Sequence, residues 1–142
     1  MLRGYDLDGT IFEVRPAWLF TFSIWMGVHG KPMLGKHRWE FYRWMQKHCG
    51  YLKMRPHWNG VIITARTRNG IEFAKPFLKH HGINLPIIHR PNDSFRGTQE
   101  VSEYKANAIL NAGVQEYWEN EWDQALLIQT LVGSFCKVHL VR

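Results

Sequence analysis

The residues with the clearest chemical potential are two carboxylates near the start of the chain, in the pattern Asp6-Leu7-Asp8-Gly9-Thr10. In an extended segment, side chains two residues apart point to the same side, so Asp6 and Asp8 would face one space. Two carboxylates that close repel unless a cation or a proton lies between them. One could attack as a nucleophile while the other carries a proton. The alternative is a solvated Asp-x-Asp-Gly turn without a chemical role.

The segments that would position this motif alternate between strands and helices. A short strand from Arg3 to Leu7 leads into it, and the continuous β-branched run Val61–Ile63 is typical of a buried parallel strand. Further strands are expected from Pro86, at Val114–Trp118 and at Lys137–Val141, and helices at Arg68–His80, Ser102–Asn111 and Asp123–Leu131. This order predicts an α/β fold, a three-layer Rossmann-like parallel sheet with helices on both faces. Such sheets bind ligands at the carboxyl ends of their strands.

Residues 15–58 interrupt this alternation, and they are expected to form a small helical cap inserted into a single domain of residues 1–142. Helices are expected over 17–26 and 37–49. The segment from 31 to 58 interleaves seven basic with six aromatic residues: Lys31, Lys36, Arg38, Arg43, Lys47, Lys53 and Arg55, with Trp39, Phe41, Tyr42, Trp44, Tyr51 and Trp58. This mixture suits a nucleic-acid backbone with stacked bases. Alternatively, the aromatic residues form the core of the cap and the charges are merely solvated.

The Asp6–Thr10 stretch resembles the first motif of the haloacid dehalogenase-like superfamily, chiefly its phosphatases. Later positions resemble the remaining motifs of that family in order: Thr64 at the end of a strand, Lys105 in the following segment, and Glu119-Asn120 followed by Asp123. The resemblance covers nearly the whole chain. The fourth motif departs from the family pattern, which has two adjacent acids where this sequence has an acid and an amide.

By this resemblance the protein would be a Mg²⁺-dependent phosphohydrolase that cleaves phosphate monoesters through an aspartyl-phosphate. Asp6 would be the nucleophile, and Asp8 would protonate the leaving oxygen and then activate water. Thr64 and Lys105 would hold phosphoryl oxygens, because phosphoryl transfer needs positioning and charge neutralisation. The resemblance implies further phosphate- or substrate-binding residues at Gly9, Thr10, Ala65, Arg66 and Arg90, and metal ligands at Asp6, Asp8, Glu119, Asn120 and Asp123.

Two arginines add a weaker similarity, to the phosphatase domains of polynucleotide kinase-type repair enzymes. Arg66 follows the second motif, and Arg90 precedes the Lys105 segment. Together with the basic insertion, they favour nucleotides or nucleic-acid 3′-phosphate ends over sugar phosphates. An ordinary Pro-Asn-Asp loop is the alternative for the Arg90 region. The altered pair Glu119-Asn120 also leaves a second function open, a fold of the same type that is catalytically weak or inactive and acts as a nucleic-acid or protein binding module.

Composition and charge bear on the expected partners and on the cellular compartment. The net charge is +6, with 11 basic and 4 acidic residues in 1–70 but 7 basic and 8 acidic in 71–142, so the excess lies beside the expected phosphate site. Two distant cysteines, Cys49 and Cys136, favour a reducing, cytoplasmic setting. The most apolar run, Ala17–Val28, has 12 residues, fewer than the ~20 that a membrane span needs. No membrane partner is therefore expected, and the oligomeric state stays open.

Overall fold

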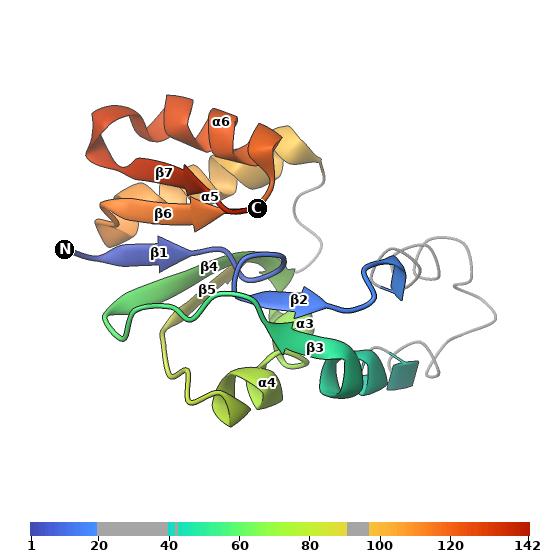
Figure 1. The fold of residues 1–142 in the computed structure, drawn as a ribbon. Coiled ribbons are helices and arrows are strands. Elements are labelled where there is room, and N and C mark those ends of the chain that lie inside the picture. The colour runs from blue at the N-terminus through green and yellow to red at the C-terminus, as the bar shows by residue number, and fades with distance from the viewer. Residues whose placement is uncertain (20–39, 42, 91–96) are drawn as a thin grey trace.

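A five-stranded parallel sheet forms the centre of the molecule (Figure 1). The structure is a computed structural model that describes residues 1–19, 40–41, 43–90 and 97–142. Across the sheet the strands are β5 (Ile87–Arg90), β4 (Gly60–Thr67), β1 (Arg3–Tyr5), β6 (Glu116–Glu119) and β7 (Lys137–Leu140). The central strand β1 pairs with β4 on one side and β6 on the other, so that Tyr5 lies opposite both Ile62 and Trp118.

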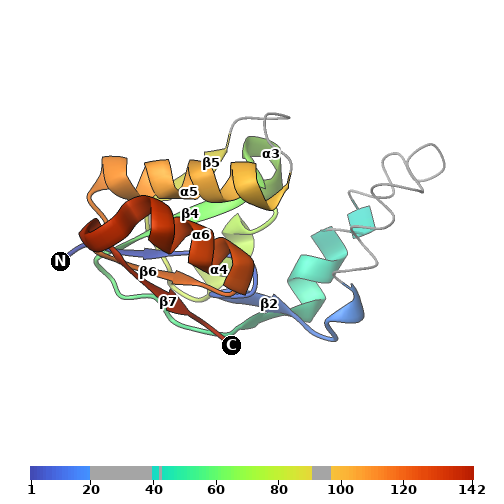
Figure 2. The ribbon, with the colours of Figure 1, turned by 90° about the horizontal axis from the view of Figure 1, so that it is seen from above.

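Helices cover both faces of this sheet. α5 (Thr98–Ala112) and α6 (Trp122–Val132) lie over one face, and α3 (Arg68–Ile71) and α4 (Lys75–His80) pack against the other (Figures 1 and 2). A short 3₁₀ turn, η1 (Gly133–Phe135), joins α6 to β7. The predicted three-layer, Rossmann-like α/β fold is therefore confirmed.

The two faces of β4 pack into separate hydrophobic clusters. Ile62 packs on the α4 side with Phe77, whereas Val61 and Ile63 pack on the α5 side with Ile109. Side chains alternate across a strand, so a strand buried on both faces needs apolar residues at every position. That requirement explains the unbroken β-branched run from which the strand was predicted.

The helix expected at Arg68–His80 is instead two short helices separated by a turn at residues 72–74. Pro76 lies in the first turn of α4, where its missing N–H costs nothing, while in the middle of a longer helix it would remove a hydrogen bond. Thr67 begins α3 by accepting a hydrogen bond from the Gly70 amide at 3.3 Å.

The segment between β1 and β4 contains a small second sheet that the sequence did not predict. β2 (Phe12–Val14) and β3 (Gly50–Leu52) pair antiparallel. Residues 40–41 and 43–49 are helical, in agreement with the helix expected over 37–49, while most of the helix expected over 17–26 lies outside the described residues. Within the described ranges, no helix is both long and apolar enough to span a membrane.

Candidate active site

Three polar side chains gather where the central strands end. Asp6 follows β1, Thr64 lies in β4 and Glu119 ends β6, and all three are buried. The Asp6 amide donates to the Trp118 carbonyl at 2.9 Å, which continues the pairing of β1 with β6 up to the motif. Because these parallel strands are neighbours, their carboxyl ends bring together residues that are far apart in sequence.

Lys105 links two of these groups from α5. Its Nζ lies 3.1 Å from Asp6 Oδ1, 2.8 Å from Glu119 Oε2 and 3.0 Å from Gln124 Oε1. The Lys105 residue is only 2% exposed. The three N–H donors of one ammonium are thus matched by three acceptors. A buried charge paired in this way becomes strongly unfavourable if its partner is removed.

Burial and neighbouring charge shift the pKa values of this cluster. Burial raises the pKa of Asp6 well above its ordinary value, the Lys105 ammonium opposes that rise, and Glu119 and Asp8 add to it. Burial alone would lower the pKa of Lys105, but Asp6 and Glu119 outweigh it and raise that pKa. Burial also raises the pKa of Tyr117, whose hydroxyl lies 3.2 Å from Glu119 Oε2. Lys105 therefore stays charged and Tyr117 stays a neutral donor.

Asp8 has a different partner. Arg66 donates two hydrogen bonds to its carboxylate, from Nε to Oδ2 at 2.9 Å and from NH2 to Oδ1 at 2.6 Å. The Arg66 amide also donates to Thr64 Oγ1 at 3.1 Å. Two planar bonds from one guanidinium fix both the position and the orientation of a carboxylate. The side chain of Arg66, predicted to bind substrate, is directed at the predicted proton donor.

The loop that follows Asp8 requires glycine. Gly9 has φ +81°, and a Cβ there would clash with the Asn120 amide, whose carbon would lie at 2.6 Å. Lys53, just after β3, donates to the Gly9 carbonyl at 2.8 Å. The Thr10 hydroxyl lies 3.4 Å from Asp6 Oδ2. The motif loop is thus held from the second sheet as well as from the sheet core.

Asn120 lies where the fourth motif was expected to supply a metal ligand. Its side-chain amide approaches Asp6 Oδ2 and the Asp8 carbonyl oxygen, and a nitrogen on that side donates to both at 2.9 Å. An oxygen on that side would instead bring three oxygens together, which a cation would stabilise. Three oxygens are ligands of the kind that Mg²⁺ takes. No three His, Cys, Asp or Glu side chains gather as metal ligands anywhere in the described residues.

A cavity of about 390 Å³ opens beside these groups. Its lining includes seven predicted site residues: Asp6, Asp8, Gly9, Ala65, Lys105, Glu119 and Asn120. Glu13, Glu121 and Gln124 also line it, and sequence reasoning had no signal for them beyond the proximity of Gln124 to the fourth motif. A larger groove of about 830 Å³ beside α4 and β5 contains none of the motif residues.

Two predicted site residues lie away from the cavity, and a third lies beside it. Asp123 accepts a hydrogen bond from Thr98 Oγ1 at 3.4 Å and is not part of the cavity lining. Arg90 ends β5, at the sheet edge, and is not part of the lining either. Thr64 is buried beside the site and also lies outside the lining.

Comparison with known proteins finds a likeness of fold. No protein-family model matches the sequence, and no curated protein matches it. The fold is similar to that of a chain in the structure of the Pnkp1/Rnl/Hen1 RNA repair complex, with a TM-score of 0.58 and 15% sequence identity. The similarity covers 99% of this chain and 42% of that chain. This chain therefore spans less than half the length of its neighbour, and at this identity the likeness concerns the fold.

Proposed function

We propose that this protein is a phosphohydrolase that cleaves phosphate monoesters with a metal ion. The observation that carries the proposal is the arrangement of Asp6 and Asp8 at one cavity, where Lys105 binds the first carboxylate and Arg66 the second. Two carboxylates with different partners in one site can take different roles in one reaction.

The proposed reaction has two steps. Asp8, whose two oxygens accept bonds from Arg66, first takes up a proton from solvent. The Asp6 carboxylate then attacks phosphorus, the bond from phosphorus to the leaving oxygen breaks, and Asp8 gives that proton to the leaving oxygen. Asp8 then accepts a proton from a water molecule, which attacks the aspartyl-phosphate, releases inorganic phosphate and restores Asp6. Lys105 holds the Asp6 carboxylate in place at 3.1 Å during both steps.

Charge balance indicates a need for a divalent cation. With Asp8 ionised, the carboxylates of Asp6, Asp8 and Glu119 pair with two cationic side chains among the described residues, Lys105 and Arg66. The remaining negative charge would repel a phosphate dianion. Mg²⁺, held by Asp6, the Asp8 carbonyl and Asn120, would supply Lewis-acid charge neutralisation.

The test of this function is hydrolysis of p-nitrophenyl phosphate with and without Mg²⁺. The wild-type protein should hydrolyse the ester when Mg²⁺ is present. Asp6→Asn should abolish hydrolysis because a side-chain amide does not attack phosphorus as a carboxylate does. Glu116→Gln is the matched control, since Glu116 pairs with His139 at 3.2 Å and is not part of the cavity lining. If Mg²⁺ supports hydrolysis of neither this ester nor nucleotides, the enzymatic function is refuted and the binding module is favoured.

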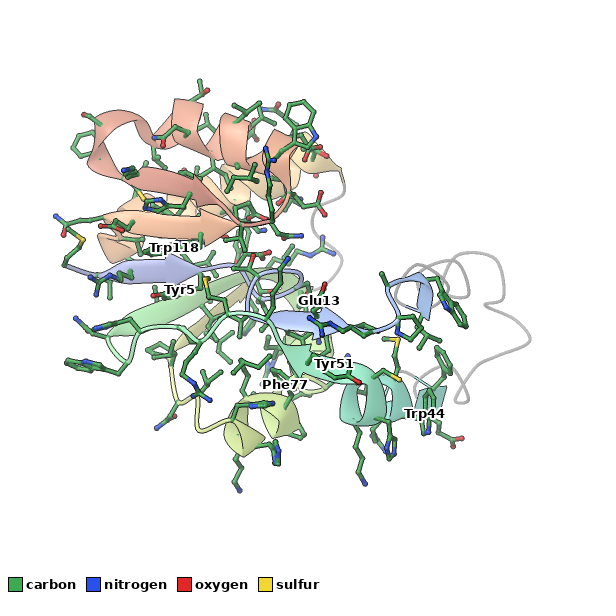
Figure 3. All side chains as sticks on the ribbon, in the orientation of Figure 1. Tyr5, Glu13, Trp44, Tyr51, Phe77 and Trp118 are labelled. Atoms are coloured by element: carbon green, nitrogen blue, oxygen red, sulfur yellow. The ribbon has the colours of Figure 1, made fainter. Side chains whose placement is uncertain are left out.

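The rim of the cavity favours nucleic-acid 3′-phosphate ends or nucleotides as substrates. Glu13 and Ala17 line the cavity, and Arg15 between them pairs with Glu13 at 3.1 Å. The Arg15 guanidinium lies 5.0 Å from the centre of the Tyr51 ring, and Glu13 and Tyr51 lie side by side on the second sheet (Figure 3). A cation on an aromatic ring at a site entrance suits a phosphate with its neighbouring base.

Exposure of the aromatic residues supports this substrate class. Trp44 and Tyr51 are 49% and 45% exposed, so these two do not form the core of a cap. Trp58, by contrast, lies beside Arg55 and Gly82 in another groove, away from the cavity. The structural neighbour from an RNA repair complex is consistent with a nucleic-acid substrate.

A comparison of two substrates distinguishes a phosphatase that recognises nucleic-acid ends from one without substrate preference. Tyr51→Ala and Arg15→Ala should raise KM for a 3′-phosphorylated oligonucleotide severalfold, because base stacking contributes about 1–3 kcal/mol, and should leave KM for p-nitrophenyl phosphate unchanged. Trp58→Ala is the control and should change neither value. Equal effects of the rim variants on both substrates would refute recognition by the rim.

A further inference from the structure

The proposed proton donor is linked to the helical segment before β3 by a chain of hydrogen bonds. Arg66 uses its Nε and NH2 edge for Asp8 and turns NH1 toward Gln46 Oε1, at 3.0 Å, and the Gly70 carbonyl, at 3.1 Å. The guanidinium carbon also lies 5.5 Å from the centre of the Phe12 ring. One planar group is therefore fixed along its edges and on its face.

Gln46 is an unusual residue for its position. It lies in the helical stretch 43–49 and is only 4% exposed, next to the buried Met45, while Trp44 on the same stretch is 49% exposed. Burying an amide costs free energy unless the amide is hydrogen-bonded, and an apolar side chain would avoid that cost. The bond from Arg66 gives the buried amide a specific partner.

We propose that Gln46 is a positioning residue for catalysis, which acts through Arg66 to hold the Asp8 carboxylate at the leaving oxygen. This inference rests on the proposed phosphatase function. Asp8 must deliver its proton as the phosphorus–oxygen bond breaks, and proton transfer tolerates little misplacement. Gln46, from the helical stretch before β3, then contributes to the chemical step.

The basicity of the leaving group separates this role from a structural one. p-Nitrophenolate leaves without much help, whereas the alkoxide of a nucleoside needs the proton from Asp8. General acid catalysis contributes about 10²–10⁴-fold, so partial misplacement should lower the single-turnover rate of leaving-group release from a nucleoside 3′-phosphate about tenfold. The single-turnover rate of p-nitrophenolate release should fall less than about twofold. Single-turnover rates are compared because Asp8 also acts as the base in the later water step, which both substrates share. General damage to the fold would lower both values alike.

The experiment uses three variants of the full chain. Gln46→Met keeps the size and loses the acceptor, so it should show the selective loss, and Gln46→Glu keeps an acceptor and should restore the ratio of the two single-turnover rates. Gln129→Met is the structural control, because Gln129 bonds the backbone of residues 133, 136 and 138 away from the cavity. Equal losses on both substrates, or no loss, in Gln46→Met would overturn the proposal.

A second measurement does not depend on turnover. A double-mutant cycle between Gln46→Met and Asp8→Asn, followed by urea unfolding, should show coupling of at least about twofold in the unfolding equilibrium constant. The coupling should vanish when Arg66→Met is the background, because Arg66 joins the two side chains. Additive effects would overturn the positioning role even if the wild type hydrolysed no ester. Coupling without hydrolysis would refute only the proposed function.

Discussion

Replacing Lys105 with methionine tests the electrostatics of the site most directly. The change keeps the length of the side chain and removes the cation from between Asp6 and Glu119, which lie 3.1 and 2.8 Å from Nζ. Removing one partner of a buried ion pair typically costs about 3–5 kcal/mol. For a domain of this size, that loss corresponds to a fall in Tm of roughly 10–15 °C.

The penalty should depend on pH, and its sign follows from the pKa of Asp6. Burial already raises this pKa above its ordinary value of 3.8, and without Lys105 it should rise further. A carboxyl group whose pKa is raised in the folded state binds protons more readily when folded, so stability falls as pH rises through that pKa. Lys105→Met should therefore be most destabilised near pH 8 and should recover toward the wild type as the pH falls.

Urea unfolding followed by tryptophan fluorescence measures this difference at each pH. Lys79→Met is the control, because Lys79 is exposed on α4 and its replacement should change stability by less than about 0.5 kcal/mol. A penalty below about 1 kcal/mol, or one that stays constant between pH 5 and pH 8, would refute the buried charge cluster described for Lys105.

Three other changes probe the motif loop and the metal. Gly9→Ala should lower stability by about 1–3 kcal/mol, since φ +81° is strained for alanine and the Asn120 amide fills the space, and urea unfolding measures it. Chelation of Mg²⁺ should stop hydrolysis, and Asn120→Ala should raise the Mg²⁺ concentration for half-maximal rate, as a titration would show. Asp123→Asn should leave that concentration unchanged, because Asp123 faces Thr98; a shift would place Asp123 at the metal.

The main sheet was predictable because its strands carry strong local signals. Val61–Ile63 is apolar at every position, and the motif resemblance placed Asp6, Lys105 and Glu119 in one expected site, where their side chains are in contact. β2 and β3 were missed because each has three residues, too few for an alternating pattern to stand out. Their pairing is set by contacts far apart in sequence.

Side chains that hold the site from a distance gave no such signal. Gln46 follows Met45 and Lys53 lies between Leu52 and Met54, and the sequence does not distinguish a buried amide or ammonium group from a solvated one. Their roles depend on partners 20 and 44 residues away, at Arg66 and at the Gly9 carbonyl. Sequence spacing could place the motifs at one edge of the sheet, but it could not show which groups orient them.

The positive charge of the first half of the chain is partly used within the molecule. Lys53 and Arg55 each donate to a backbone carbonyl at 2.8 Å, and Arg66 is bound to Asp8. A cation held by the protein itself releases few counterions when nucleic acid binds, so the count of basic residues overstates the attraction to a polyanion. Arg15 also pairs with Glu13, but its side chain stays 59% exposed beside the lining residues Glu13 and Ala17, and we propose that it meets the substrate there. Selectivity for a nucleic-acid end should therefore depend on this rim more than on the net charge of the chain.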